Sequence, residues 1–531
     1  MKLLLIGILW YLAIISSSFA DENITDRYFP ASFKLGAASS AYQVEGGWNE
    51  DGKGENMWDN FLHDNASRVA DSTNGDIACD SYHKWKEDVQ LLKEMGAQVY
   101  RFSISWSRIL PNGSTNNVNQ AGVDYYLNLI KDLLANGIEP LVTLYHWDLP
   151  EHLKELGGWL NPQITDYFAE YARLAFSLYG EYVKTWITVN EPNTTCLLGY
   201  GNTMDAPGLV LIGDGVYQCA KLQVMAHAKA YRIYDEDFRA TQRGKVSLAL
   251  DTPWSEPASD DPLDIEAAER ELEFGFGWYA NPIYLGDWPK IMKERIDDRS
   301  KREGLGFSRL PPFTKEEINL INGIFDFFGV NLYTANLVSY TADYNISVPN
   351  YWLDKGNNVY TDPSWPASAV DWLKYAPFAM RKLLNYIHNT YNPGEIFVTE
   401  NGWVDTPGII DDQDRTRYHR VFFRVYTKQM KKGSLQGYLS GLLEALLDDG
   451  VNVVGYTAWS LMDNFEWTSG YSNRLGLIYV DHESPNRTRI WKASGKYYKN
   501  VIETRCLLDT CREYGLDGNR NKSNLPEFLR I

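Results

Sequence analysis

Eight short runs rich in β-branched and aromatic residues alternate with helix-like segments along this chain of 531 residues. The runs are typical of buried strands and lie at residues 32–39, 98–106, 139–147, 182–190, 244–250, 325–334, 395–401 and 453–459. Between two of them, residues 124–136 place Tyr126, Ile130, Leu133 and Leu134 at helical spacing, and Gly137 follows. Eight strands alternating with helices predict an α/β fold, a single (β/α)8 TIM barrel with long βα loops.

The two ends of the chain predict segments outside this barrel. Lys2 precedes a short apolar stretch from Leu3 to Ile15 that ends in a small-x-small cleavage pattern, which indicates a secretory signal peptide. We therefore expect three parts: a signal peptide over residues 1–20, the barrel over 21–505 and a polar C-terminal tail over 506–531. Residues Asp343–Asp371, rich in Asn, Asp, Pro and Trp, predict a long loop at the top of the barrel.

The charge of the chain limits its partners. The formal net charge is −18 at pH 7, and an acidic surface repels phosphate backbones and anionic lipid headgroups. We expect no nucleic-acid partner and no membrane partner, because no run beyond the signal approaches the length of a membrane span. The eight histidines never pair with cysteines at metal-site spacing, so we expect no metal and no cofactor. The oligomeric state is not predicted.

Two glutamates lie just beyond β-branched runs, and each is followed by turn residues. Glu191 ends the sequence TVNE before Pro192, and Glu400 ends VTE before Asn401-Gly402. Carboxylates at the C-terminal ends of two strands of a parallel barrel point toward one site. Two carboxylates on either side of an anomeric carbon are what the hydrolysis of a glycoside requires.

Five segments together resemble family 1 of the glycoside hydrolases, the β-glucosidases. They are NEP, TENG, FSISWSRILP, TLYHWDLP and AWSLMDNFEW, and the similarity runs from about Phe29 to about Ile502. The resemblance implies a retaining β-glucosidase that hydrolyses terminal β-D-glucosyl residues through a covalent glycosyl-enzyme. With the signal peptide, it also implies a secreted, extracellular animal protein of the insect type, with a small β-glycoside or short oligosaccharide as partner.

The resemblance assigns the catalytic roles. A glutamate is usually a surface residue, but in these contexts Glu400 matches the nucleophile and Glu191 the acid/base. The nucleophile must be ionised, and its negative charge should raise the pKa of the acid/base until an ester forms. The supporting residues implied by the resemblance are Arg101, Asn331 and Tyr333.

The resemblance also implies a set of sugar-binding residues. Asn190 matches a ligand of the 2-hydroxyl, Glu466 matches a ligand of the 4- and 6-hydroxyls, and Trp459 matches a platform under the sugar ring. A carboxylate at Glu466 would repel a phosphate, which predicts a neutral sugar. The full expected set is Gln43, His146, Asn190, Tyr333, Trp459, Glu466 and Trp467.

Secretion has consequences for the cysteines and for N-x-S/T sequons. Cys506 and Cys511 are close enough for a small-loop disulfide, and among Cys79, Cys196 and Cys219 we expect at least one free thiol. The sequons are Asn23, Asn65, Asn112, Asn193, Asn345, Asn486 and Asn521. Asn193 lies two residues after a candidate catalytic acid, so we expect it to be unglycosylated.

Two other functions stay open at the level of the sequence. A thioglucosidase acting on glucosinolates would share these motifs; plant thioglucosidases carry Gln at the position of Glu191, whereas animal ones retain the acid. A non-catalytic barrel used as a binding protein, like klotho, has typically lost one of the two glutamates. Both are present here, which favours the β-glucosidase. The aglycone is not predicted, because βα loops build that part of the site.

Overall fold

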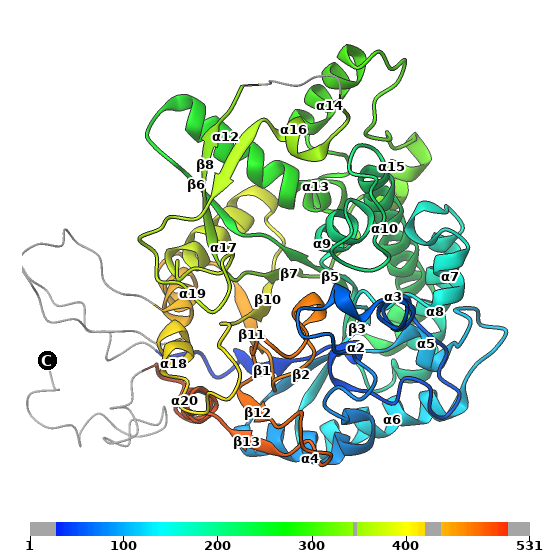
Figure 1. Ribbon diagram of the computed structural model, residues 1–531, viewed down its shortest axis with the longest axis vertical. Coiled ribbons are helices and arrows are strands. Elements are labelled where there is room, and N and C mark those ends of the chain that lie inside the picture. Colours follow the sequence, from blue (N-terminus) through cyan, green and yellow to red (C-terminus); the bar gives the residue numbers. More distant parts are fainter. Residues whose placement is uncertain (1–27, 343–347, 420–436, 508–531) are drawn as a thin grey trace, which may run out of the picture.

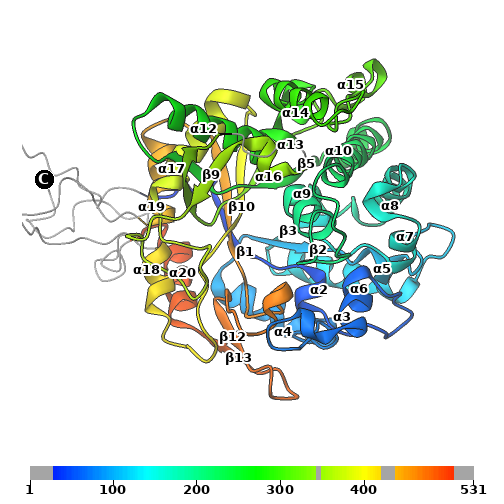
Figure 2. The same ribbon diagram turned by 45° about the horizontal axis from the view of Figure 1, so that its top comes forward.

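Eight parallel strands close into a barrel in this computed structural model, which describes residues 28–342, 348–419 and 437–507. Figures 1 and 2 show the barrel enclosed by helices. Around the barrel the strands follow the order β1-β11-β10-β7-β5-β4-β3-β2. Their bounds are β1 (Lys34–Ala38), β2 (Val99–Ser103), β3 (Glu139–Tyr145), β4 (Thr185–Asn190), β5 (Lys245–Asp251), β7 (Phe328–Asn331), β10 (Ile396–Asn401) and β11 (Val453–Trp459). Each overlaps one predicted run, and the predicted TIM barrel is confirmed.

The helices that surround the strands bury one apolar face each. The longer ones are α4 (Ser81–Met95), α6 (Gln120–Ala135), α8 (Ile164–Tyr179), α10 (Gly215–Ile233), α17 (Phe378–Tyr391), α19 (Tyr438–Leu447) and α20 (Ala493–Thr504). In α6 the predicted face is right for Tyr126, Ile130 and Leu133, which are buried. Leu134 is 39% exposed, so its predicted place on that face is wrong. Helix α6 starts four residues earlier than the predicted segment at 124.

A three-stranded sheet lies outside the barrel and corrects the expected loop. It contains β6 (Trp254–Pro257), β8 (Ala335–Tyr340) and β9 (Asn357–Tyr360), packed by α12 (Pro262–Leu272). The described part of Asp343–Asp371 therefore contains β9 and the short helix α16 (Tyr351–Lys355). The side chain of Asn350 caps α16 by accepting from the backbone N–H of Trp352. Turn-rich composition hid these elements, because β9 forms only by pairing with the distant β8.

The remaining elements form the ends and connections of the barrel. The helices are α2 (Ala41–Val44), α3 (Met57–Asp64), α5 (Trp106–Ile109), α7 (Glu151–Glu155), α9 (Pro192–Thr194), α11 (Arg239–Gln242), α13 (Trp278–Leu285), α14 (Lys290–Arg302), α15 (Lys315–Ile321) and α18 (Gln413–His419). The hairpin strands are β12 (Ile478–Val480) and β13 (Arg489–Trp491). Within the described residues, no helix combines the length and apolarity that crossing a membrane requires.

The interior of the barrel consists of two unlike layers. The apolar layer is a separate cluster of Val99, Leu141, Ile187, Ala249, Phe327 and Phe397. Two residues further along β2, β3 and β10 stand Arg101, Thr143 and Thr399, all buried. Because residues two apart in a strand share a face, these side chains form the next, polar layer toward the C-terminal ends of the strands.

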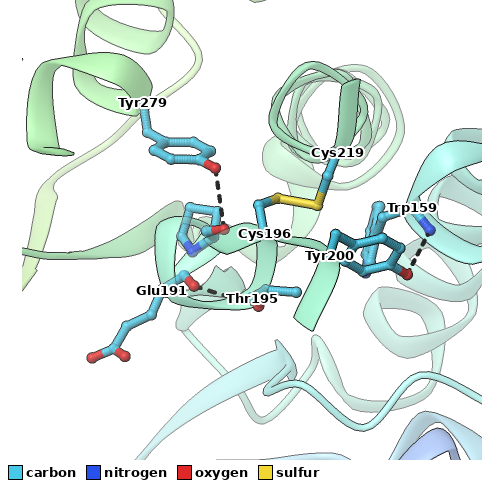
Figure 3. Close-up of a disulfide and its surroundings, with 8 residues drawn as sticks. Trp159, Glu191, Thr195, Cys196, Tyr200, Cys219 and Tyr279 are labelled. Carbon is cyan, nitrogen blue, oxygen red and sulfur yellow. Dashed lines mark hydrogen bonds between the residues drawn. A yellow bond between two sulfur atoms is a disulfide. The ribbon is translucent and has the colours of Figure 1, made fainter. Parts of the chain in front are cut away.

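One disulfide forms among the three cysteines whose pairing the sequence left open. A disulfide joins Cys196, just beyond β4, to Cys219 on α10, as Figure 3 shows. Cys79 is the buried free thiol, and its Sγ donates to the carbonyl oxygen of Asp463. The expectation of at least one free thiol among these three is therefore right. Cys511 lies outside the described residues, so its pairing with Cys506 stays a prediction, as do the signal peptide and the tail.

Candidate active site

The C-terminal ends of β4 and β10 bring the two candidate glutamates to the same end of the barrel. Glu191 follows β4 directly in a left-handed backbone conformation (φ 45°), and its N–H donates to the Ala249 carbonyl of β5 over 2.9 Å. Glu400 lies within β10 and pairs in register with Asn331 of β7. Both glutamates are buried, with 8% and 3% of their surface exposed. Both are thus removed from bulk water at one end of the barrel, on strands that β5 and β7 separate.

Glu400 is surrounded by donors. An Arg101 guanidinium nitrogen forms a buried ion pair with one carboxylate oxygen, and the Tyr333 hydroxyl donates to the other over 2.6 Å. The same guanidinium donates to the Thr399 carbonyl over 3.1 Å and to Asn190 Oδ1 over 2.6 Å. A positive charge and an O–H donor stabilise the carboxylate form, which a nucleophile requires.

Glu191 has the opposite surroundings. Its Oε1 accepts from Asn331 Nδ2 over 2.7 Å. Burial raises the pKa of Glu191 well above its ordinary value, and the negative charges of Asp251 and Glu400 raise it further. Asn331 and Arg101 lower this pKa but do not reverse the direction. The repulsion expected from Glu400 is present, but burial and Asp251 come before it among the causes.

Gln43 and Glu466 lie side by side in the site. Gln43 Nε2 donates to the Phe465 carbonyl over 2.9 Å and reaches Glu466 Oε2 at 3.3 Å. Burial, Glu400 and Asp463 raise the pKa of Glu466 to about 8. Its carboxyl is therefore mostly protonated at neutral pH and can donate as well as accept. The resemblance to family 1 predicted a charged carboxylate here.

Aromatic rings form one wall of the site. Trp459 ends β11, and its ring stacks on that of His146 with centroids 5.5 Å apart and planes 15° apart. Trp467 stacks on Tyr42 at 5.9 Å. His146 Nε2 lies 3.1 Å from Asn190 Nδ2, and burial followed by the charge of Arg101 lowers the pKa of His146 well below its ordinary value. A neutral imidazole accepts this bond and remains available to a hydroxyl group.

The comparisons with known proteins agree with this geometry. The sequence profile of Glycosyl hydrolase family 1 matches residues 25–506. Myrosinase 1 of Brevicoryne brassicae is 46% identical over 483 residues, which cover 90% of this chain and 99% of that protein. Cytosolic beta-glucosidase of Cavia porcellus is 44% identical over 482 residues, with coverages of 90% and 99%. The chain belongs to glycosyl hydrolase family 1.

The structural comparison gives the same result. The solved structure of aphid myrosinase superimposes with a TM-score of 0.83 at 45% identity and covers 90% of this chain and 99% of that chain. As a family 1 member, the protein is a retaining glycoside hydrolase, and its relatives are β-glucosidases and myrosinases. In the parts of the chain that the structure describes, no group of three His, Cys, Asp or Glu side chains could hold a metal ion.

The glycine of the TENG segment has a local reason in this family 1 site. A Cβ atom on Gly402 would lie 1.9 Å from the carbonyl oxygen of Trp459. Only a residue without a side chain lets the segment after Glu400 approach the end of β11 this closely. The segment after Glu400 and the aromatic wall are thereby held together through their backbones.

Several residues of the family 1 site were not predicted. Thr399 Oγ1 donates to Asn331 Oδ1 over 2.6 Å, which orients the amide toward Glu191. Trp372, 53% exposed, meets the Tyr333 ring edge-on at 5.9 Å. Asp251 ends β5 and acts on the pKa of Glu191. Its position at the C-terminal end of a predicted strand was the signal that could have found it.

Proposed function

We propose that the protein is a β-glucosidase for neutral β-D-glucosides, with Glu400 as nucleophile and Glu191 as acid/base. The contrast between the two glutamates carries the proposal. Arg101 and Tyr333 stabilise the charge of Glu400, whereas burial and two nearby carboxylates keep the proton on Glu191. A carboxylate paired with a guanidinium, beside a buried carboxyl group that keeps its proton, is the arrangement of nucleophile and acid.

Each glutamate has one task in each of two steps. In the first, Glu400 forms a bond to the anomeric carbon while Glu191 gives its proton to the departing oxygen and becomes a carboxylate. The ester removes the charge of Glu400, so one cause of the raised pKa of Glu191 disappears. In the second step Glu191 takes a proton from water, which attacks the anomeric carbon and releases Glu400 with retention of configuration.

The sugar-binding residues support a glucoside as substrate. Gln43 and Glu466 offer an amide and a carboxyl at hydrogen-bonding distance from each other, as neighbouring hydroxyls of one sugar require. The Trp459 ring offers an apolar face. Glu400 and Asp463, whose charges raise the pKa of Glu466, also disfavour a phosphate on the sugar.

A thioglucosidase is the second candidate, because the aphid relative is a myrosinase at 46% identity. Glu191 does not separate the two functions. Hydrolysis of allyl glucosinolate and of a phenyl β-D-glucoside by the same preparation would decide between them by the ratio of the two kcat/KM values. A klotho-like role as a binding protein without catalysis is less well supported, since both glutamates are hydrogen-bonded within the site.

We further propose that the protein is secreted, with residues 1–20 as its signal peptide, 21–505 as the catalytic domain and 506–531 as a tail. The disulfide between Cys196 and Cys219 supports an oxidising compartment. Asn65 and Asn486 are exposed sequon asparagines and are the positions we expect to carry glycans. Mass spectrometry of the protein from culture medium would test the cleavage site and both glycans.

The stereochemistry of the product tests the proposed reaction. When a phenyl β-D-glucoside is hydrolysed in an NMR tube, the β-anomer of glucose should appear first, and mutarotation should produce the α-anomer later. First appearance of the α-anomer would exclude a double displacement. Absence of hydrolysis across β-glucosides, β-galactosides and glucosinolates would favour the role as a binding protein.

A further inference from the structure

A third carboxylate, Asp251, stands beside the proposed acid. Asp251 is the last residue of β5, the strand between β4 and β7 in the barrel. It pairs in register with Asn331, whose side chain donates to Glu191 over 2.7 Å. The Glu191 N–H is hydrogen-bonded to Ala249, two residues before Asp251 on the same strand. The end of β5 is therefore connected to Glu191 in two ways. One is the backbone hydrogen bond to Ala249, and the other is Asn331, which pairs with Asp251 and donates to Glu191.

The carboxylate of Asp251 is held on one side and unpaired on the other. Its Oδ2 accepts from Thr194 Oγ1 over 3.1 Å. Its Oδ1 is buried and meets no donor at hydrogen-bonding distance among the described residues, although the Asn193 side chain lies near enough to lower the pKa of Asp251. A buried oxygen without a donor is costly to leave in a fold unless it has a use.

The segment that carries Thr194 is itself fixed. Figure 3 shows the Tyr279 hydroxyl directed at the Pro192 carbonyl, a bond of 3.1 Å, and the disulfide from Cys196 to helix α10. The carboxyl end of Glu191 points away from this disulfide. The helical turn after the acid is thus anchored at both ends, and Thr194 is held in place to orient Asp251.

We propose that Asp251 is a positioning residue that acts through Glu191 and strengthens its hold on the proton in both steps of the reaction. This inference rests on the proposed acid/base role of Glu191. Glu400 loses its charge when the glycosyl-enzyme forms, but the charge of Asp251 persists. It therefore keeps Glu191 a stronger base toward water in the second step than Glu191 would otherwise be.

The titratable and charged groups around Asp251 and Glu191 set the pH range in which Asp251 is charged. Burial raises the pKa of Asp251 to about 6, with a further contribution from Glu400, and the Thr194 bond lowers it. Arg101, Glu400 and Tyr333 are the other titratable or charged groups that interact with Glu191. The phenols that interact with Asp251 are those of Tyr279 and Tyr351. Burial raises the pKa of both phenols well above the ordinary value, so they stay neutral.

The hydrogen bond from Thr194 to Asp251 also bears on glycosylation of the sequon at Asn193. Its threonine neighbour Thr194 donates to Asp251 inside the site. The Oδ1 of Asn193 is buried. The sequence Asn193-Thr194-Thr195 therefore serves the acid of the reaction and should carry no glycan.

The test is the pH profile of kcat/KM for phenyl β-D-glucoside in Asp251→Asn. Without the negative charge, Glu191 should lose its proton at lower pH, so the basic limb should move to lower pH. At a pH on the wild-type basic limb, we expect a loss of roughly threefold or more after each profile is scaled to its maximum. Asp251→Glu, which keeps the charge, should move the limb back toward the wild type.

Controls separate this inference from folding and from the proposed function. Asp298→Asn removes the same charge from the exposed side of α14 and should leave both limbs in place. If Asp251→Asn does not fold by circular dichroism, Thr194→Val, which removes the donor to Asp251, should move the basic limb in the same direction by less. An unmoved basic limb in a folded variant overturns the inference. In Glu191→Gln the basic limb should vanish; its persistence would instead overturn the acid/base role.

Discussion

Two successive layers of one barrel interior differ in almost every property. Val99, Leu141 and Phe397 belong to a buried apolar cluster, while Arg101 and Thr399, two residues later on the same strands, belong to a hydrogen-bonded polar layer. The apolar layer stabilises the fold because the burial of its side chains removes apolar surface from water. The polar layer has a cost, because burying a guanidinium and a carboxylate is unfavourable until their partners compensate. Along the strands, the layer that stabilises the barrel is thus separate from the layer at the C-terminal ends that holds the site.

The largest effect should come from removing the nucleophile at the polar end of β10. Glu400→Gly should lower kcat/KM for aryl β-glucosides by at least roughly 10⁴-fold, because no covalent intermediate can form. Added azide or formate should restore turnover by occupying the vacated space. The matched control is Glu395→Gln, because Glu395 directly precedes β10 at its opposite end. Glu395 forms only a partly exposed ion pair with Lys245, so this control should keep full activity.

Near-normal activity of Glu400→Gly without additives would contradict the assignment of the nucleophile. Loss of activity in Glu395→Gln to a similar extent would remove the contrast between the two ends of the strand.

A smaller and more selective effect is expected at the acid. Glu191→Ala should leave glycosylation by dinitrophenyl glucosides nearly intact, since such leaving groups need no proton. For alkyl glucosides it should slow the step by roughly 10²–10⁴-fold. Steady-state and pre-steady-state rates across a series of leaving groups measure this dependence. Azide should give a β-glucosyl azide. Equal losses for good and poor leaving groups would argue for a different acid.

The next effect concerns the sugar. Glu466→Ala should lower kcat/KM for an aryl β-glucoside by roughly one to two decades, the loss typical of a strong hydrogen bond, and by less for the 6-deoxy β-fucoside. Burial and nearby charges raise the pKa of Glu466 to about 8, so the carboxyl is mostly neutral at pH 6. Glu466→Gln should therefore be the milder variant at pH 6. An equal or smaller drop for the glucoside than for the fucoside would show that Glu466 does not bind the 6-hydroxyl.

The smallest effect on catalysis should come from the apolar layer. Leu141 is fully buried, and Leu141→Ala should lower the free energy of unfolding by about 2–5 kcal/mol while kcat of the folded enzyme stays close to the wild type. Leu134→Ala on α6 is the matched control, because Leu134 is 39% exposed and its truncation should cost less than about 0.5 kcal/mol. Urea unfolding followed by activity measurements compares the two. A large fall in kcat for folded Leu141→Ala would show that the layers are coupled.

The sequence predicted the features that depend on strand periodicity and on the residues at strand ends. All eight barrel strands were predicted from their β-branched runs, and Glu191 and Glu400 lie at the end of the barrel where the side chains of parallel strands converge. The contacts among Arg101, Tyr333 and Glu400 agree with the roles implied by the family.

What the sequence did not predict depends on distant neighbours. The pairing of Cys196 with Cys219 needs the approach of α10 to the turn after β4. Strand β9 forms by pairing with β8, whereas its Asn-rich composition alone favours a loop. Asp251 looks like any strand-end aspartate until β4 places Glu191 beside it. The raised pKa of Glu466 follows from burial and from charges on other segments.

Trapping the glycosyl-enzyme tests the central assignment most directly. A dinitrophenyl 2-deoxy-2-fluoro-β-D-glucoside slows both steps, but its leaving group favours the first, so the covalent intermediate accumulates. Peptide mass spectrometry of the inactivated protein should find one fluoroglucosyl group per chain, on Glu400. Glu400→Gln should take up none, and Leu141→Ala should be labelled like the wild type. A label on Glu191 or any other residue, or time-dependent labelling of Glu400→Gln, would contradict the proposed mechanism.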